Sequence, residues 1–255
     1  MAIVREVFRR LPGEFRVCSI RTAEMLKYAS NIFHALKITF ANEMGRICQA
    51  LDIDPHEVMN LVCQDTDRTI SSAYLRPGFA YGGSCLPKDL RAICHLAGRQ
   101  DVIIPMLSAV AHSNEIHIDH AISFVLATGR KSIGMIGLSF KGGTDDLRES
   151  PLVVMTERFI GKGLNLKIYD PMVSISRLIG ANRRYIEETI PHIELLMCDE
   201  LPALIDESQV LVVGLQAEAI VAELHQRCRA DHVILDLVAL PARHQLKGTY
   251  RGVCW

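Results

Sequence analysis

Apolar residues in the first part of the chain recur at helical spacing. Between Arg21 and Leu51 they return every third or fourth position, and no proline or glycine intervenes before Gly45. One long helix is therefore predicted over residues 21–51. A second helix is predicted to begin at Asp54-Pro55, because aspartate is a favoured N-cap and proline is favoured at the first helical position. Further helical patterns cover residues 87–98 and 103–127, and residues 64–84 look irregular.

The pattern changes at Gly129, after which short apolar runs alternate with helical segments. A helix over residues 151–160 is predicted behind Ser150, because serine is a favoured N-cap residue. Alternating strands and helices form right-handed crossovers and a parallel sheet. The fold class predicted is α/β, with an all-α first half over residues 21–128 and a Rossmann-like parallel α/β domain over residues 129–255. The predicted strands cover residues 131–139, 164–169, 210–213 and 233–237.

Composition narrows the class of protein. The 255 residues are 49% hydrophobic and 22% charged, which is ordinary for a soluble globular protein. The net charge of −1 gives no reason to expect nucleic acid as a partner. No apolar run approaches the ~20 residues that a membrane span needs, and the first residues do not resemble a signal peptide. We therefore expect a cytoplasmic protein. The histidines and cysteines form no metal-binding motif, so metal catalysis is not expected.

Cys85 stands in Gly-Gly-Ser-Cys-Leu-Pro-Lys-Asp, after a glycine-rich loop and just before a predicted helix. A thiol at a helix N-terminus feels the positive end of the helix dipole, and Lys88 adds a positive charge nearby. Both favour the thiolate, which is the reactive form. Asp89 returns to the same helical face and could orient water or a base. A single cysteine is more often a small buried apolar residue, but these surroundings favour a nucleophile.

Two further groups of polar residues are more ambiguous. The segment from Phe140 to Pro151 follows the first predicted strand, where ligands bind in doubly wound sheets. Its Lys141 and Arg148 suit phosphates or carboxylates, although a solvated loop with a capping serine explains it equally well. On the long helix, Lys27, Asn31 and His34 share one face. Interhelical hydrogen bonds are the ordinary explanation for such a stripe.

The α/β half lacks the dinucleotide fingerprint G-x-G-x-x-G. Gly161-Lys-Gly163 precedes the second predicted strand rather than following the first, and Gly134-Met-Ile-Gly137 has the wrong spacing. The domain is thus Rossmann-like without the signature of NAD binding.

Two long motifs together resemble the UDP-glucose/GDP-mannose dehydrogenase family. They are Gly-Phe-Ala-Tyr-Gly-Gly-Ser-Cys-Leu-Pro-Lys-Asp-Leu around Cys85 and Leu-Ser-Phe-Lys-Gly-Gly-Thr-Asp-Asp-Leu-Arg-Glu-Ser-Pro up to Pro151. Residues 22–31 are similar to the start of that family's central helix. The Arg148 segment, residues 190–194 and the Cys-Trp end resemble the GDP-mannose branch. Ala73 departs from that branch, which tends to carry a second tyrosine before Tyr74.

The resemblance implies three domains. Residues 1–20 would be the remnant of an NAD-binding domain, residues 21–128 a central dimerisation domain, and residues 129–255 a nucleotide-sugar-binding domain. It implies NAD as cofactor, a homodimer formed through the helix 21–51, and four-electron oxidation of a nucleotide sugar at C6, from GDP-mannose to GDP-mannuronate. Because the fingerprint is missing, we expect the isolated chain to be a truncated, inactive portion.

The resemblance also implies residue roles. Cys85 would attack the C6 aldehyde left by a first hydride transfer, and a second transfer would give a thioester that water cleaves. Lys27 and Asn31 would stabilise negative charge on the C6 oxygen, and Asp89 would help activate water. The implied substrate contacts are His34, Asn42, Tyr74, Arg76, Phe79 and Gly82, and the implied cofactor contacts are Lys88, Lys141 and Arg148.

Two alternatives remain open. The same chemistry could act on UDP-glucose or UDP-N-acetylmannosamine. A non-catalytic module for nucleotide-sugar binding or dimerisation would also retain the loops and the long helix. Cys85, Lys27 and Asp89 argue against that module, because a binding protein needs no nucleophile.

Overall fold

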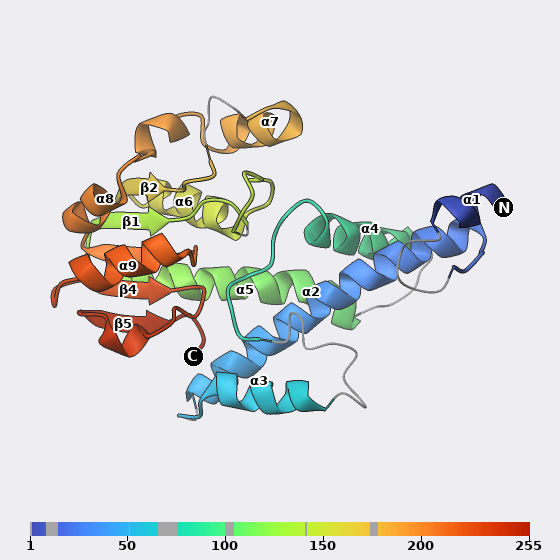
Figure 1. Cartoon of the computed structure of the whole chain (residues 1–255), viewed down its shortest axis with the longest axis horizontal. Coiled ribbons are helices and arrows are strands. Elements are labelled where there is room, and N and C mark those ends of the chain that lie inside the picture. Colours follow the sequence, from blue (N-terminus) through green and yellow to red (C-terminus); the bar gives the residue numbers. More distant parts are fainter. Residues whose placement is uncertain are drawn as a thin grey trace.

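The computed structural model describes residues 2–8, 15–50, 52–65, 76–99, 105–140, 142–173 and 178–255. It confirms the predicted fold class, with a helical part followed by an α/β part that is built on a parallel sheet (Figure 1). No helix within these ranges is long and apolar enough to span a membrane.

The helical part is organised around one long helix, α2 (Ile20–Ala50), which spans 31 residues and nearly matches the predicted bounds. It packs against α3 (Pro55–Gln64), α4 (Leu86–Arg99) and α5 (Pro105–Ala127). The short α1 (Ala2–Val7) precedes it. The predicted start of α3 is confirmed, since the Asp54 carboxylate accepts the main-chain N–H groups of His56 and Glu57. These contacts satisfy donors that a helix leaves unpaired at its first turn.

The sheet contains five parallel strands in the order β2-β1-β3-β4-β5. The strands point toward the helical part, so their carboxyl ends face it (Figure 1). The connecting helices are α6 (Pro151–Gly161), α7 (Gly180–Thr189), α8 (Leu201–Glu207) and α9 (Glu218–Arg227), with the short 3-10 helices η2 (Ile193–Leu196) and η3 (Arg243–Gln245). The strands are β1 (Ser132–Ile136), β2 (Asn165–Tyr169), β3 (Val210–Val213), β4 (Val233–Asp236) and β5 (Thr249–Gly252).

The first strand ends three residues before the predicted end. Gly137 has a φ of +111°, a conformation open to glycine that breaks the strand. The N–H groups of Leu138 and Ser139 then donate to the Asp170 carboxylate instead of a neighbouring strand. β5 was not predicted, because its sequence Thr-Tyr-Arg-Gly has no apolar run.

Helices cover both faces of the sheet. Apolar residues of α8 and α9 pack on one face, with Ile136, Leu211 and Ile234 among their buried partners. Apolar residues of α5 and α6 cover the other face. Because α5 belongs to the helical part and also packs on the sheet, the two parts share one core. This shared core fixes the position of the loop that enters α4.

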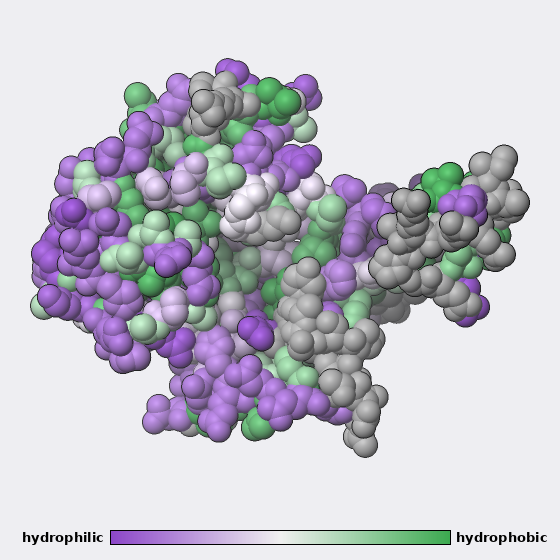
Figure 2. Space-filling view, in the orientation of Figure 1, coloured by the Kyte–Doolittle hydropathy of each residue, from purple (hydrophilic) through white to green (hydrophobic). Residues whose placement is uncertain are grey.

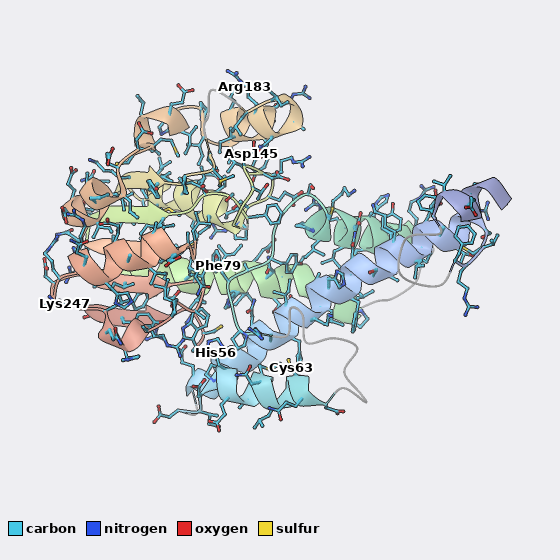
Figure 3. All side chains as sticks on the ribbon, viewed as in Figure 1. His56, Cys63, Phe79, Asp145, Arg183 and Lys247 are labelled. Carbon is cyan, nitrogen blue, oxygen red and sulfur yellow. The ribbon has the colours of Figure 1, made fainter. Side chains whose placement is uncertain are left out.

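The end of the chain ties the two parts together a second time. Cys254 lies against Gly45 of α2, where an added Cβ would sit 2.8 Å from the Cys254 carbonyl oxygen. The Trp255 ring lies 5.1 Å from that of His56 on α3, and Figure 3 places His56 at this junction. The Trp255 indole N–H donates to the Tyr250 hydroxyl at 2.9 Å.

Candidate active site

Cys85 lies at the point where the glycine-rich loop enters α4. Its side chain is exposed, and its carbonyl oxygen accepts the N–H of Asp89 at 2.9 Å, which closes the first helical turn. The Ser84 hydroxyl oxygen is 3.9 Å from the Cys85 sulfur. The thiol therefore stands at the N-terminal end of a helix and is accessible to a ligand, an arrangement that favours reactive cysteines.

Asp89 is the centre of a charged cluster beside Cys85. Its side chain is 1% exposed, and its Oδ2 accepts a short hydrogen bond from the Asn31 amide. The Lys27 ammonium is 3.5 Å from Oδ2, and the Lys88 ammonium is 3.3 Å from Oδ1. The cluster joins α2 to α4 in the helical turn that begins at Cys85.

Burial raises the pKa of Asp89, but the hydrogen bond from Asn31 and the nearby positive charges of Lys88 and Lys27 outweigh it. The pKa of this carboxyl is therefore held below its usual range. Because a carboxylate with a lowered pKa is a weak base, the cluster suits Asp89 to orienting its cationic and amide partners. Both lysines keep more than half of their side-chain surface exposed and can reach a ligand.

The glycine-rich loop before Cys85 is held by three polar side chains. The Asn42 side-chain oxygen accepts the N–H of Gly78 at 2.9 Å, and its NH₂ group donates to the Phe79 carbonyl oxygen at 3.3 Å. Asn114 on α5 makes two 3.0 Å hydrogen bonds with the backbone of Tyr81. His117, also on α5, lies with Nε2 2.8 Å from the Gly78 carbonyl oxygen. The loop is thus fixed from α2 and α5 together.

The same loop touches the α/β part through its glycines. A Cβ on Gly82 would lie 2.4 Å from the Glu149 carbonyl oxygen and 2.5 Å from Cδ of Pro151. Gly83 has a φ of +84°, and its N–H donates to the same Glu149 oxygen at 3.4 Å. The ring of Phe140 packs against it. Only glycine allows this close approach of two backbones.

Arg148, in the α/β part, brings a cation near Cys85. Its guanidinium donates in a bidentate manner to the Asp146 carboxylate, at 2.9 and 2.7 Å. The hydrogen bond to Asp146 is the main cause of its raised pKa, and the negative charge of Asp146 adds to it against the opposing effect of desolvation. Arg148 lies within electrostatic reach of Cys85, and Asp146 fixes the direction of its guanidinium.

A cavity of about 400 Å³ opens at the carboxyl ends of β1, β3 and β4. The strand order reverses between β1 and β3, which is where ligands bind in doubly wound sheets. Phe79 from the loop and Phe140 from the α/β part both line it, and Figure 3 shows Phe79 where the two parts meet. The surrounding surface of the α/β part is mainly hydrophilic (Figure 2). The cavity also includes residues 214–216, which our sequence analysis missed although a glycine directly after a strand marks such positions.

The predicted site residues fall into distinct places. Lys27, Asn31, Lys88 and Asp89 meet beside Cys85, and Asn42, Phe79 and Gly82 hold or form the loop. His34 is half-buried on α2, while the exposed Arg76 contributes to the electrostatics of His56 at the junction with α3. Tyr74 and Lys141, like the departure at Ala73, lie outside the described residues.

Other residues of the site escaped our sequence analysis. Asn114 and His117 lie in a mostly polar stretch of α5, so no local signal distinguishes them from their polar neighbours. Arg91 and Glu149 form an ion pair although they are 58 residues apart, so no local pattern could have found them.

The comparisons agree with this geometry. Residues 21–116 match the central domain of the UDP-glucose/GDP-mannose dehydrogenase family, and residues 134–240 match that family's UDP binding domain. The GDP-mannose 6-dehydrogenase of Pseudomonas aeruginosa is 41% identical over 99% of this chain. A UDP-glucose 6-dehydrogenase of Bacillus subtilis is 37% identical over 66% of the chain and 39% of that relative. The chain spans 58% of the length of the Pseudomonas relative.

Solved structures show the same architecture. A ternary complex of GDP-mannose dehydrogenase from Pseudomonas aeruginosa superposes with a TM-score of 0.66 at 42% identity, covering 100% of this chain and 58% of that one. A UDP-glucose dehydrogenase from Pyrobaculum islandicum gives a TM-score of 0.83 at 26% identity, covering 100% and 56%. With both parts of the fold and the loop motifs in agreement, the chain belongs to the UDP-glucose/GDP-mannose dehydrogenase family.

Proposed function

We propose that this chain supplies the catalytic and nucleotide-sugar-binding parts of an NAD-dependent GDP-mannose 6-dehydrogenase, which oxidises GDP-mannose to GDP-mannuronate. The observation that carries the proposal is the exposed Cys85 at the start of α4, with the buried Asp89 and its partners Lys27, Asn31 and Lys88 in the helical turn that follows. A module for binding alone would need neither an accessible thiol nor cations fixed beside it.

In this mechanism Cys85 acts as a covalent nucleophile. Its sulfur donates an electron pair to the C6 aldehyde carbon, and the former carbonyl oxygen takes up a proton to complete a thiohemiacetal. Lys27 and Asn31, held by Asp89, stabilise negative charge as it develops on that oxygen. After oxidation of the same carbon the sulfur carries a thioester, whose cleavage by water releases the carboxylate and restores the thiol.

The charges around the thiol also suit NAD, which supplies the hydride acceptor for both oxidation steps when it is bound. Lys88 and Arg148 are cations with accessible surface, and their chemistry fits the pyrophosphate of a dinucleotide. Because the sequence contains no G-x-G-x-x-G fingerprint, we propose that the main dinucleotide cradle is supplied by a segment outside these 255 residues.

The nucleotide part of the substrate is assigned to the cavity at the carboxyl ends of the strands. The match of residues 134–240 to a UDP binding domain supports this assignment. The GDP-mannose branch is favoured because the Pseudomonas and Azotobacter vinelandii relatives, at 41% identity, are GDP-mannose 6-dehydrogenases. The second candidate is a UDP-sugar 6-dehydrogenase, which the Bacillus and Pyrobaculum relatives favour.

A homodimer is part of the same proposal. The long helix α2 exposes large apolar side chains, among them Leu26 at 67% and Phe40 at 47% of their surface. Apolar side chains of this size on one helix are typical of a surface that a second copy covers.

Calorimetric titration of the purified chain tests substrate choice. GDP-mannose should bind at least tenfold more tightly than UDP-glucose, and Cys85→Ser should bind GDP-mannose with unchanged affinity, because the thiol acts after binding. Stronger binding of UDP-glucose would transfer the proposal to the UDP-sugar alternative.

Turnover tests the catalytic cluster. In the chain co-expressed with a separate dinucleotide-binding domain, Lys27→Met should lower kcat by roughly 10²-fold, as expected for loss of an electrostatic stabiliser. Lys162→Met removes an equally charged and likewise exposed side chain at the end of α6, away from the Asp89 cluster, and serves as the control. Equal rates for the two variants would remove Lys27 from the mechanism.

A further inference from the structure

Glu149 contacts the catalytic segment on both sides of Cys85. Its carboxylate accepts two hydrogen bonds from the Arg91 guanidinium on α4, at 2.7 and 2.6 Å. Its carbonyl oxygen accepts the N–H of Gly83 and lies against Gly82. One residue of the α/β part therefore holds the chain two residues before the thiol and six residues after it.

The conformation of Glu149 shows that this arrangement is specific. Its backbone φ is +51°, in the left-handed region that residues other than glycine rarely adopt. That conformation lets the carbonyl point at the cysteine loop while the side chain points at α4. Bidentate pairing with Arg91 fixes the direction as well as the distance, since a guanidinium fork matches a carboxylate only in one plane.

The neighbours of Glu149 connect the pair to the reacting groups. Arg148, within electrostatic reach of Cys85, precedes it directly. Ser150, which follows it, caps α6 by accepting the N–H of Leu152 at 3.2 Å and donates to the Leu138 carbonyl oxygen at 2.7 Å. Glu149 is thus fixed to the frame of the sheet, and any movement of it would move Arg148 relative to the thiol.

We propose that Arg91 is a positioning residue for the reaction: through Glu149 it sets the register between the Cys85 loop and the nucleotide-sugar-binding part. This inference rests on the proposed function for its kinetic consequence. The structural part of the inference, that the Arg91–Glu149 pair holds the Cys85 loop in register, rests on the contacts alone. Arg91 is 59% and Glu149 33% exposed, so screening by water keeps the contribution of the pair to overall stability small. Its effect is on geometry, to which covalent catalysis is sensitive on the scale of 1 Å.

Amide hydrogen exchange of the full 255-residue chain tests the structural content. Arg91→Met should speed exchange in the segments 79–86 and 144–150 and leave the other segments unchanged. Glu149→Gly should do the same while it relieves the left-handed backbone, because glycine adopts that conformation freely. The swap of Arg91→Glu with Glu149→Arg should restore slow exchange. Arg183→Met, which breaks a pair of equal length with Glu187 on α7, is the control.

The kinetic consequence is tested in the chain co-expressed with a dinucleotide-binding domain. Arg91→Met should lower kcat roughly tenfold with little change in the KM for the nucleotide sugar, and the swap should recover most of the loss. The melting temperature should stay within about 2 °C of the parent protein.

Each outcome decides the inference. Unchanged exchange in both segments overturns it, whatever the turnover. Faster exchange with unchanged kcat overturns its catalytic part. Faster exchange that the swap reverses, in a protein that never turns over any nucleotide sugar, supports the positioning contact and counts against the proposed function.

Discussion

Replacement of Gly82 by alanine tests the close approach of the cysteine loop to the α/β part. The added methyl carbon would lie 2.4 Å from a carbonyl oxygen of Glu149 and 2.5 Å from Cδ of Pro151. Neither neighbour is the free end of a flexible side chain, so relief requires movement of backbone. Overpacking of this kind costs about 1–3 kcal/mol. In a domain of this size, such a loss lowers the melting temperature by roughly 2–4 °C per kcal/mol.

The matched control is Gly161→Ala at the end of α6, where no atom of the described residues lies within 4 Å of the added methyl group. Its unfolding free energy should stay within about 0.5 kcal/mol of the parent protein. Urea denaturation of the three proteins measures the difference, and titration with GDP-mannose should show weakened binding for Gly82→Ala alone. Equal stability of the two variants would mean that the loop does not approach Glu149 as closely as the structure shows.

Three further predictions concern other polar contacts. The pKa of Asp89 lies below its ordinary value of 3.8, so its ionised form stabilises the fold above about pH 4, and that contribution is lost as the pH falls further. Between about pH 5 and pH 3, Asp89→Asn should therefore lose less unfolding free energy than the parent protein. Parallel curves of unfolding free energy against pH for the two proteins would contradict this. Tyr250→Phe removes a 2.6 Å hydrogen bond to the buried Asp236 carboxylate and should cost about 1.5–3 kcal/mol in urea denaturation, whereas no loss would show that the carboxylate does not depend on it. Ser150→Ala removes both the cap of α6 and the hydrogen bond to the Leu138 carbonyl oxygen, and it should cost about 1–3 kcal/mol by the same measurement; an unchanged unfolding free energy would contradict the capping role.

Local sequence rules were sufficient for most elements of the fold. Asp54-Pro55 and Ser150-Pro151 located two helix starts, because capping depends on adjacent residues. The predicted strand at residues 210–213 has the observed bounds, since a strand buried on both faces is a continuous apolar run. β5 could not be predicted, because it is an edge strand defined by its pairing with β4.

The site shows the same division between local and long-range information. Cys85, Lys88 and Asp89 are close in sequence, so their juxtaposition at a helix start could be predicted. Asn31 and Asp89 meet across 58 residues, and only the resemblance to a family suggested that they belong together. The clamps on the loop from Asn114 and His117 follow from how α5 packs, which hydrophobic patterning alone does not specify.

The most direct test of the central claim is the stoichiometry of turnover in the chain co-expressed with a dinucleotide-binding domain and supplied with GDP-mannose and NAD. NADH is followed by absorbance and the uronate product by mass spectrometry. Covalent catalysis by Cys85 predicts two molecules of NADH for each GDP-mannuronate, and no uronate from Cys85→Ser. Uronate formation at the parent rate by Cys85→Ser would contradict covalent catalysis by this thiol.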